Sequence, residues 1–99
     1  MMENTVIQYD YEMSLDHREF LRTFSQVFPQ GGYLYQNNQL MIERGIQRMV
    51  VSLAPSSERK IALLSLPVTQ VKFEFFYTEP EIADEWMQQI MRYFQRGGG

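Results

Sequence analysis

The sequence predicts an α+β fold, with one antiparallel sheet of about five strands and two helices on one of its faces. Three observations lead to this prediction. Two segments carry apolar residues at helical spacing, the segments before and between them alternate apolar and polar residues, and the connections between strands are short. The chain has 99 residues, of which 44% are hydrophobic and 21% charged, which fits a single α+β domain over residues 1–99.

The chain begins with a predicted strand and helix. Residues 5–13 alternate between apolar and polar side chains, which indicates a strand with one solvated face. Ser14 is the predicted N-cap of the helix that follows. Pro29 and the glycines at 31 and 32 end this helix. Its single apolar stripe consists of Phe20, Leu21, Phe24, Val27 and Phe28.

The middle of the chain predicts a run of four strands. Residues 32–55 have strand character, and Asn37–Asn38 can adopt the positive φ angles that a tight hairpin turn needs. Gly45 is either a second turn or a bulge within one long strand, and the sequence leaves both open. The run continues with a turn at Pro55–Ser57, a strand at 60–66, a turn at Pro67 and a strand at 70–77.

A second predicted helix closes the chain. Thr78 and Glu81 have the spacing of a capping box, with Pro80 in the first turn. Acidic residues gather at the start of this helix, and Arg92 and Arg96 lie at its end. The helix dipole favours both groups, so they need no active site to explain them. The apolar stripe consists of Ile82, Ala83, Trp86, Ile90, Tyr93 and Phe94.

The predicted order is therefore strand, helix, four strands and helix. This order resembles one repeat of the TATA-box-binding-protein fold and, more loosely, the helix-grip domains. The resemblance concerns topology alone. It implies an antiparallel sheet covered by helices and no particular activity, because one fold carries many functions.

Composition and motifs argue against several functions. The net charge of −3 is unfavourable for a general nucleic-acid binder, which needs basic side chains for the phosphates. With no cysteine, the chain has no disulfide, thiolate metal site or cysteine nucleophile. No phosphate-binding loop, nucleophile elbow or zinc-protease motif appears, which leaves an enzymatic activity unsupported. We expect no catalytic residue, no cofactor and no metal.

The ends of the sequence suggest where the protein works. No signal peptide is visible at the N-terminus, and no apolar run approaches the roughly 18 residues of a membrane span. We therefore expect a cytoplasmic protein with no membrane span. The glycines at 97–99 predict a flexible end.

His17 is the single histidine and shares a helix side with Phe20 and Phe24. We favour a structural role for it over that of a general base, because no nucleophile stands nearby in the sequence. An alternative function is a small-ligand binder or a modest enzyme with an apolar pocket between helices and sheet. The residues predicted to line that pocket are Tyr9, Tyr11, His17, Phe24 and Trp86.

The last predicted strand carries an apolar residue on its polar side. Phe73 and Phe75 point to one side of this strand. Phe76 falls on the other side, together with Lys72 and Glu74. Other strands also send apolar side chains to this helix-free face, and a contiguous apolar patch tends to mark an interface. We therefore predict a non-enzymatic interaction or assembly module, binding itself as a homodimer or another protein, through Met41, Arg48, Val50, Leu64, Leu66, Lys72, Glu74 and Phe76.

Binding of single-stranded nucleic acid is a third possible function. It would use a locally basic middle of the chain together with the tyrosines of the sheet. Glu43 and Glu58 offset that basic charge, so we rank this function last. The basic residues are Arg44, Arg48, Arg59 and Lys60.

Overall fold

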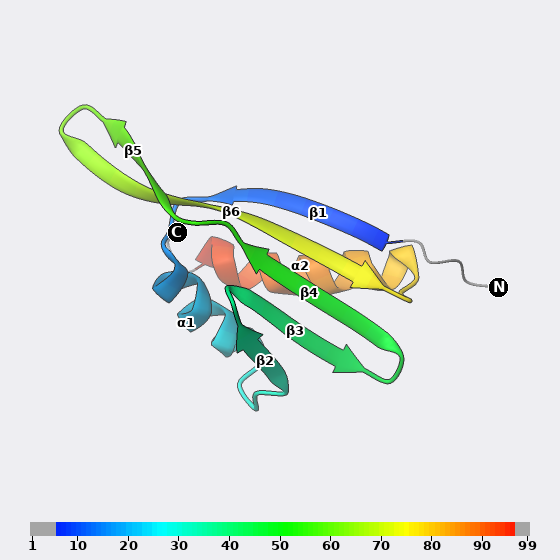
Figure 1. Ribbon diagram of the computed structural model, residues 1–99. Coiled ribbons are helices and arrows are strands. Elements are labelled where there is room, and N and C mark those ends of the chain that lie inside the picture. The colour runs from blue at the N-terminus through cyan, green and yellow to red at the C-terminus, as the bar shows by residue number, and fades with distance from the viewer. Residues whose placement is uncertain (1–5, 97–99) are drawn as a thin grey trace.

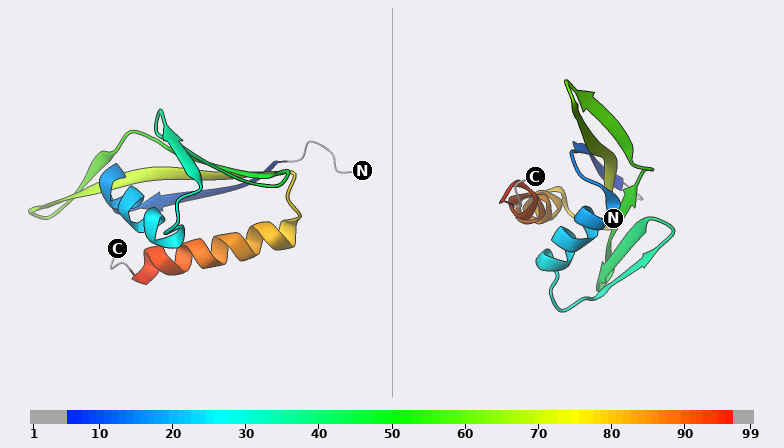
Figure 2. Two further views of the ribbon diagram at one scale, coloured as in Figure 1. Left: turned by 90° about the horizontal axis from the view of Figure 1, so that it is seen from below. Right: turned by 90° about the vertical axis from the view of Figure 1, so that its left-hand side faces the viewer.

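The computed structural model describes residues 6–96, so Thr5 of the first predicted strand and the predicted flexible end at 97–99 lie outside the described part of the chain. The described residues form an antiparallel sheet of six strands with two helices on one face (Figure 1, Figure 2). The elements are β1 (Val6–Met13), α1 (His17–Val27), β2 (Tyr33–Gln36), β3 (Gln39–Arg44), β4 (Gln47–Leu53), β5 (Ser57–Ile61), β6 (Leu64–Phe76) and α2 (Pro80–Arg96). Neighbouring strands follow the order β1-β6-β4-β3-β2, and β5 pairs with β6 beyond the end of β4.

This architecture confirms the α+β class and the predicted succession of strands and helices. The run between the helices contains five strands. One reason is that Gly45 belongs to a turn: Arg44 pairs with Gln47, and Gly45 has a φ of 62°. The turn predicted at Asn37–Asn38 is also present, with φ angles of 54° and 60°. Left-handed residues of this kind match the twist of the strands that a two-residue hairpin joins.

The cap of α1 lies two residues beyond the predicted one, so the assignment of Ser14 is wrong. The carboxylate of Asp16 accepts a hydrogen bond from the backbone N–H of Glu19 at 2.8 Å. In return, the carboxylate of Glu19 accepts one from the N–H of Asp16 at 3.3 Å. This reciprocal capping box satisfies N–H groups that a helix start leaves unpaired. Ser14 has His17 at the corresponding spacing, which cannot complete such a box.

The core lies between the helices and the sheet face that they cover. Phe20 and Phe24 of α1, and Phe73 and Phe75 of β6, are at most 1% exposed. The rings of Phe20 and Phe73 have centroids 6.4 Å apart, so α1 packs directly on the central strand. Burying a phenylalanine contributes roughly 1.5–3 kcal/mol relative to exposing it. This aromatic layer therefore fixes both helices to one face of the sheet.

Two further contacts hold α2 against the sheet. The hydroxyl of Tyr9 on β1 donates a hydrogen bond to Oδ1 of Asp84. On the other side of the helix layer, the guanidinium of Arg44 lies 4.9 Å from the ring centroid of Trp86. A cation over an aromatic face is attracted to its electrons. Both contacts lie at the rim of the core, where polar groups keep access to water.

The strand β6 ends one residue earlier than predicted. Tyr77 has a left-handed backbone with a φ of 56°, which turns the chain out of the sheet and leaves its side chain exposed. Thr78, the predicted cap of α2, donates its hydroxyl to the carbonyl of Phe76 at 2.9 Å. The helix itself begins at Pro80.

The turn predicted at Pro55–Ser57 is wrong. After Leu53 the chain continues along β6, and Ser57 pairs with Val68. Residues 54–56 therefore lie opposite residues 69–70, so this side carries one residue more than its partner. One extra residue in an antiparallel pair is a β-bulge, which bends the strand and increases its twist.

Beyond the bulge, β5 and the first part of β6 form a hairpin that projects past the helices (Figure 1). We call residues 57–68 the arm. The chain reverses at Ala62–Leu63, where Ala62 has a φ of 56°. The turn predicted at Pro67 is therefore wrong too. Pro67 fits inside β6 because β1 does not extend alongside this part of the strand, and proline is tolerated where its missing N–H faces a free edge.

Polar contacts fix the base of the arm to the start of α1. The hydroxyl of Thr69, which is fully buried, donates to the carbonyl of Leu15 at 2.7 Å and lies 2.9 Å from the hydroxyl of Ser56. Nε2 of His17 lies 2.6 Å from the carbonyl oxygen of Ala54 in the bulge. A carbonyl oxygen only accepts, so Nε2 carries the proton. His17 thus joins α1 to the bulge.

Candidate interaction surface

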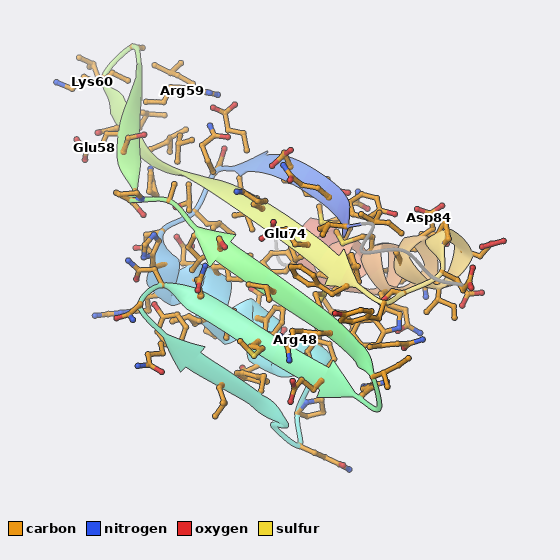
Figure 3. The ribbon with its side chains drawn as sticks, turned by 45° about the vertical axis from the view of Figure 1, so that its right-hand side comes forward. Arg48, Glu58, Arg59, Lys60, Glu74 and Asp84 are labelled. Carbon is orange, nitrogen blue, oxygen red and sulfur yellow. The ribbon has the colours of Figure 1, made fainter. Side chains whose placement is uncertain are left out.

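The side of the main sheet that faces away from the helices receives alternate side chains from each of its strands. Because Phe73 and Phe75 face the helices, the even-numbered residues between them and after them face the other way. Figure 3, with the helices behind the strands, shows Arg48 and Glu74 over this side. We call it the helix-free face. Strand pairing arranges it in three rows: Val6, Phe76, Arg48 and Glu43; Gln8, Glu74, Val50, Met41 and Leu34; Asp10, Lys72, Ser52, Gln39 and Gln36.

An apolar band crosses this face from edge to edge. It takes one side chain from each of the five strands of the main sheet. Leu34 is 73% exposed, Val6 and Met41 are also exposed, and Val50 and Phe76 are half-buried. Pairing places Val6 beside Phe76, and Val50 beside Met41, which in turn pairs with Leu34. The two groups lie in adjacent rows and meet at diagonal neighbours, because Phe76 pairs with Arg48 and Val50 pairs with Glu74. This grouping distinguishes the band from the scattered apolar residues that any protein surface shows.

Charges of both signs border the apolar band. Nη2 of Arg48 lies 2.8 Å from Oε2 of Glu43, with both side chains about half exposed. Lys72 and Glu74 follow each other on the same side of β6. Exposed pairs of this kind contribute little to the stability of a monomer. They do set which surfaces can approach, because like charges repel across an interface.

The arm continues the helix-free face. Nη2 of Arg59 lies 2.7 Å from Oε2 of Glu12, reaching from β5 across β6 to β1. The amide of Gln70 donates to the same carboxylate oxygen at 3.2 Å. Glu12 and Gln70 belong to the helix-free face, and Arg59 pairs with Leu66. Leu66 and, one alternation further along β6, Leu64 therefore lie on the same side of the molecule as the apolar band.

Leu63, the most exposed apolar side chain of the described chain, lies on this arm with three further exposed apolar side chains. Leu63, in the turn, is 102% exposed, and Leu64 is 63% exposed. Ile61 and Leu66 are exposed as well. We call these four residues the arm cluster. Figure 3 shows Glu58, Arg59 and Lys60 around the same hairpin, so charged side chains surround the cluster.

Within the described part of the chain, the residues predicted to line an alternative ligand pocket lie in different surroundings. Phe24 is fully buried and its ring packs against that of Phe20. Trp86 packs edge-on against Phe75, and His17 binds the bulge. Tyr9 and Tyr11 line an open depression of about 280 Å³ between β1 and α2. Within residues 6–96, aromatic and aliphatic side chains pack together between the helices and the sheet.

The fold changes the ionisation of Tyr9. Partial burial of its hydroxyl, the hydrogen bond to Asp84 and the negative charge of Asp84 together raise the pKa of Tyr9 to about 12. The phenol is protonated at neutral pH and donates its hydrogen bond to Asp84. It fastens α2 to β1 and lies on the helix-covered side, away from the apolar band.

Neither a metal site nor a membrane helix appears in the described chain. No three histidine, aspartate or glutamate side chains within residues 6–96 lie close enough together to hold a metal ion. Neither helix is long and apolar enough to cross a membrane over the range that the structure describes.

Most of the basic residues in the middle of the chain are already engaged. Arg48 pairs with Glu43, Arg59 pairs with Glu12, and Arg44 lies over Trp86. A phosphate backbone would compete with these carboxylates and this ring for the same side chains. The arrangement therefore lends no support to the nucleic-acid function.

Sequence reasoning missed four exposed members of this surface: Val6, Leu34, Ile61 and Leu63. Alternation shows that a strand has two sides, but only pairing with its neighbours shows which side the helices cover. The arm was hidden because turns were predicted at two prolines. An available signal was the run from Ile61 to Leu64, which contains no polar residue and so does not alternate.

Comparison of the chain with models of protein families, with curated proteins and with solved structures gives no match. The resemblance to a TATA-box-binding-protein repeat therefore stays a prediction.

Proposed function

We propose that this protein is a non-enzymatic interaction module that binds a second copy of itself through the helix-free face. The observation that carries the proposal is the apolar band, which crosses the five strands of the main sheet opposite the helices. Contiguous exposed apolar surface tends to mark a protein interface. The arm cluster extends the same apolar surface beyond the main sheet.

A second copy is favoured as the partner because the face carries both charges in adjacent positions. Lys72 and Glu74 differ in sign and project from the same side of β6. In an interface with two-fold symmetry, each patch meets the same patch of its partner. Such a face can pair lysine with glutamate twice, whereas a surface of one sign requires a partner of the opposite sign. Met41, Val50 and Phe76 then form the apolar centre.

A cytoplasmic location is part of the proposal. A chain without cysteine gains nothing from an oxidising compartment, and its stability comes from the aromatic core.

Size-exclusion chromatography with light scattering tests the proposal. We expect the wild type to have the mass of a dimer at micromolar concentration. Phe76→Asp should be a monomer, because a carboxylate in the middle of the band loses its hydration when two faces meet. Tyr93→Asp is the matched control, since Tyr93 is an exposed aromatic residue on α2, and it should remain a dimer. A wild type that stays monomeric at every concentration, or a dimer that Phe76→Asp leaves intact, contradicts the proposal.

A further inference from the structure

Exposed apolar side chains lie at both ends of the long axis of the molecule. The described chain measures 54 × 27 × 25 Å. The arm cluster occupies one end, and the turn between β3 and β4 lies at the opposite end, close to the end of β6 (Figure 1). In that turn Ile46 is 77% exposed, and Tyr77, just after β6, is exposed too. Neither belongs to the core cluster.

The charges at the middle of the helix-free face distinguish two ways of packing a pair of copies. Lys72 and Glu74 lie on either side of the position of Phe73 on β6. If the two β6 strands run in opposite directions about this midpoint, Lys72 of each copy faces Glu74 of the other. If they run in the same direction, lysine faces lysine and glutamate faces glutamate, which is repulsive. The charge order therefore favours the antiparallel arrangement.

We infer that two copies pack face to face with antiparallel β6 strands, and that the arm of each clasps the far end of the other, with Leu66 beside the partner's Ile46. The inference rests on the proposed function, since it requires the helix-free faces to meet. Leu63 and Leu64 then extend past the partner's Tyr77. One two-fold axis relates both arm contacts, so the assembly closes as a dimer and does not grow into a filament.

The register of the sheet supports this placement. Leu66 lies seven residues from Phe73 on one side of the midpoint. On the other side of the midpoint, Arg48 of β4 pairs with Phe76 of β6, three residues from Phe73. Ile46 lies two residues beyond Arg48, so Ile46 is level with the fifth residue from Phe73. The two positions differ by two residues, or about 7 Å along a strand. Two apolar side chains can bridge that offset.

Site-directed crosslinking tests the arrangement directly, because the chain contains no cysteine of its own. One variant carries Leu66→Cys and a second, with a larger tag, carries Ile46→Cys. The two are mixed, left to exchange subunits and treated with a flexible bis-maleimide. We expect a covalent dimer of mixed mass at a yield about tenfold above that of either variant alone. Replacing Ile46→Cys by Arg92→Cys, on the exposed side of α2, should abolish it.

The same samples separate failure of this inference from failure of the proposed function. If light scattering shows monomers, the proposed function fails and this inference fails with it. If it shows dimers, but Leu66→Cys crosslinks to itself as efficiently as to Ile46→Cys, arms meet arms and this inference alone is overturned. Dimers with no crosslink between Leu66→Cys and Ile46→Cys overturn it as well.

A charge exchange provides a second test that leaves the arm unchanged. Lys72→Glu and Glu74→Lys should each raise the dissociation constant at least about tenfold, because each creates two like-charge contacts. The double exchange should restore the wild-type value, since every contact is again between opposite charges. Circular dichroism confirms that the variants are folded. Single variants that weaken the dimer without recovery in the double exchange contradict the antiparallel arrangement.

Discussion

Phe73 and Phe76 lie three residues apart on β6, and the fold places them in different surroundings. Phe73 is fully buried, with its ring centroid 5.8 Å from that of Tyr11 and 6.4 Å from that of Phe20. Phe76 is half-buried on the helix-free face, between Val6 and Arg48 on the neighbouring strands. A strand that carries large apolar residues on both sides needs two covers. The helices supply one, and we propose that a second copy supplies the other.

Replacing each of the two phenylalanines by alanine should give the largest difference in stability. Phe73→Ala should lower the free energy of unfolding by about 3–5 kcal/mol, because it removes a ring from a packed core and leaves a cavity. Phe76→Ala should cost less than about 1 kcal/mol in dilute solution, where the monomer dominates. Urea denaturation followed by the fluorescence of Trp86, the single tryptophan, measures both. Equal losses would show that the two faces are equally buried within one chain.

At the base of the arm, the buried hydroxyl of Thr69 can be compared with an exposed hydroxyl further along the arm. Thr69→Val keeps the shape of the side chain but removes the hydroxyl that binds Leu15 and contacts Ser56. We expect a loss of about 1–3 kcal/mol, because the carbonyl of Leu15 is left without this donor. Ser65→Ala, on the exposed part of the arm, should leave the unfolding midpoint unchanged. A neutral Thr69→Val would mean that the arm base is not braced by this contact.

Substitutions at the rim of the helix-covered face should lower the stability less than substitutions at its centre. Arg44→Gln removes the cation over Trp86 and should cost about 0.5–1 kcal/mol, as expected for an exposed cation–π contact. The emission of Trp86 should change in the folded state, since its immediate neighbour changes. Arg22→Gln, an exposed arginine on α1, serves as the control and should alter neither quantity. An unchanged emission spectrum for Arg44→Gln argues against the contact in solution.

The contribution of Tyr9 to stability is expected to depend on pH. The fold raises the pKa of Tyr9 to about 12 from an ordinary value of 10.0, so the folded state holds this proton more tightly than the unfolded state. Its contribution to stability is fully present below pH 10 and is lost as the pH rises through about 12. The stability of the wild type should therefore decline more steeply over this range than that of Tyr9→Phe.

Absorbance at 295 nm checks the assignment independently. A phenol that titrates near pH 12 in the wild type should be missing from Tyr9→Phe. If both proteins titrate alike, the hydrogen bond between Tyr9 and Asp84 does not persist in solution.

The alternation of apolar and polar residues and the helical stripes were sufficient to predict the α+β class, the helices and the turn at Asn37–Asn38. They were insufficient wherever proline was taken as the end of a strand. Pro55 lies in a bulge and Pro67 beside a free edge, and both tolerate a missing N–H. Edges and bulges depend on which strands pair, and that information is not local in the sequence.

The candidate surface could be predicted only in part, because strand pairing is not local in the sequence. Phe76 breaks the alternation of its own strand, so it could be identified without knowing its neighbours. Val6 and Leu34 also break the alternation, since each is apolar on the polar side of its strand, but only pairing with Phe76 and Met41 showed that they lie on one continuous face. His17 and Tyr9 were assigned to a pocket because helical and strand spacing place them near the core, whereas their partners, Ala54 and Asp84, are distant in sequence.

Two methionines on adjacent strands test the central claim most directly. Met49 on β4 faces the helices and is fully buried, whereas Met41 on β3 faces away from them and is exposed. NMR of methyl-labelled methionine with a soluble paramagnetic agent reports how closely solvent approaches each methyl group. We predict that Met49 is protected at every protein concentration, and that Met41 is strongly relaxed in dilute solution and becomes protected as concentration rises. A Met41 methyl that stays equally accessible from dilute to concentrated solution contradicts the account.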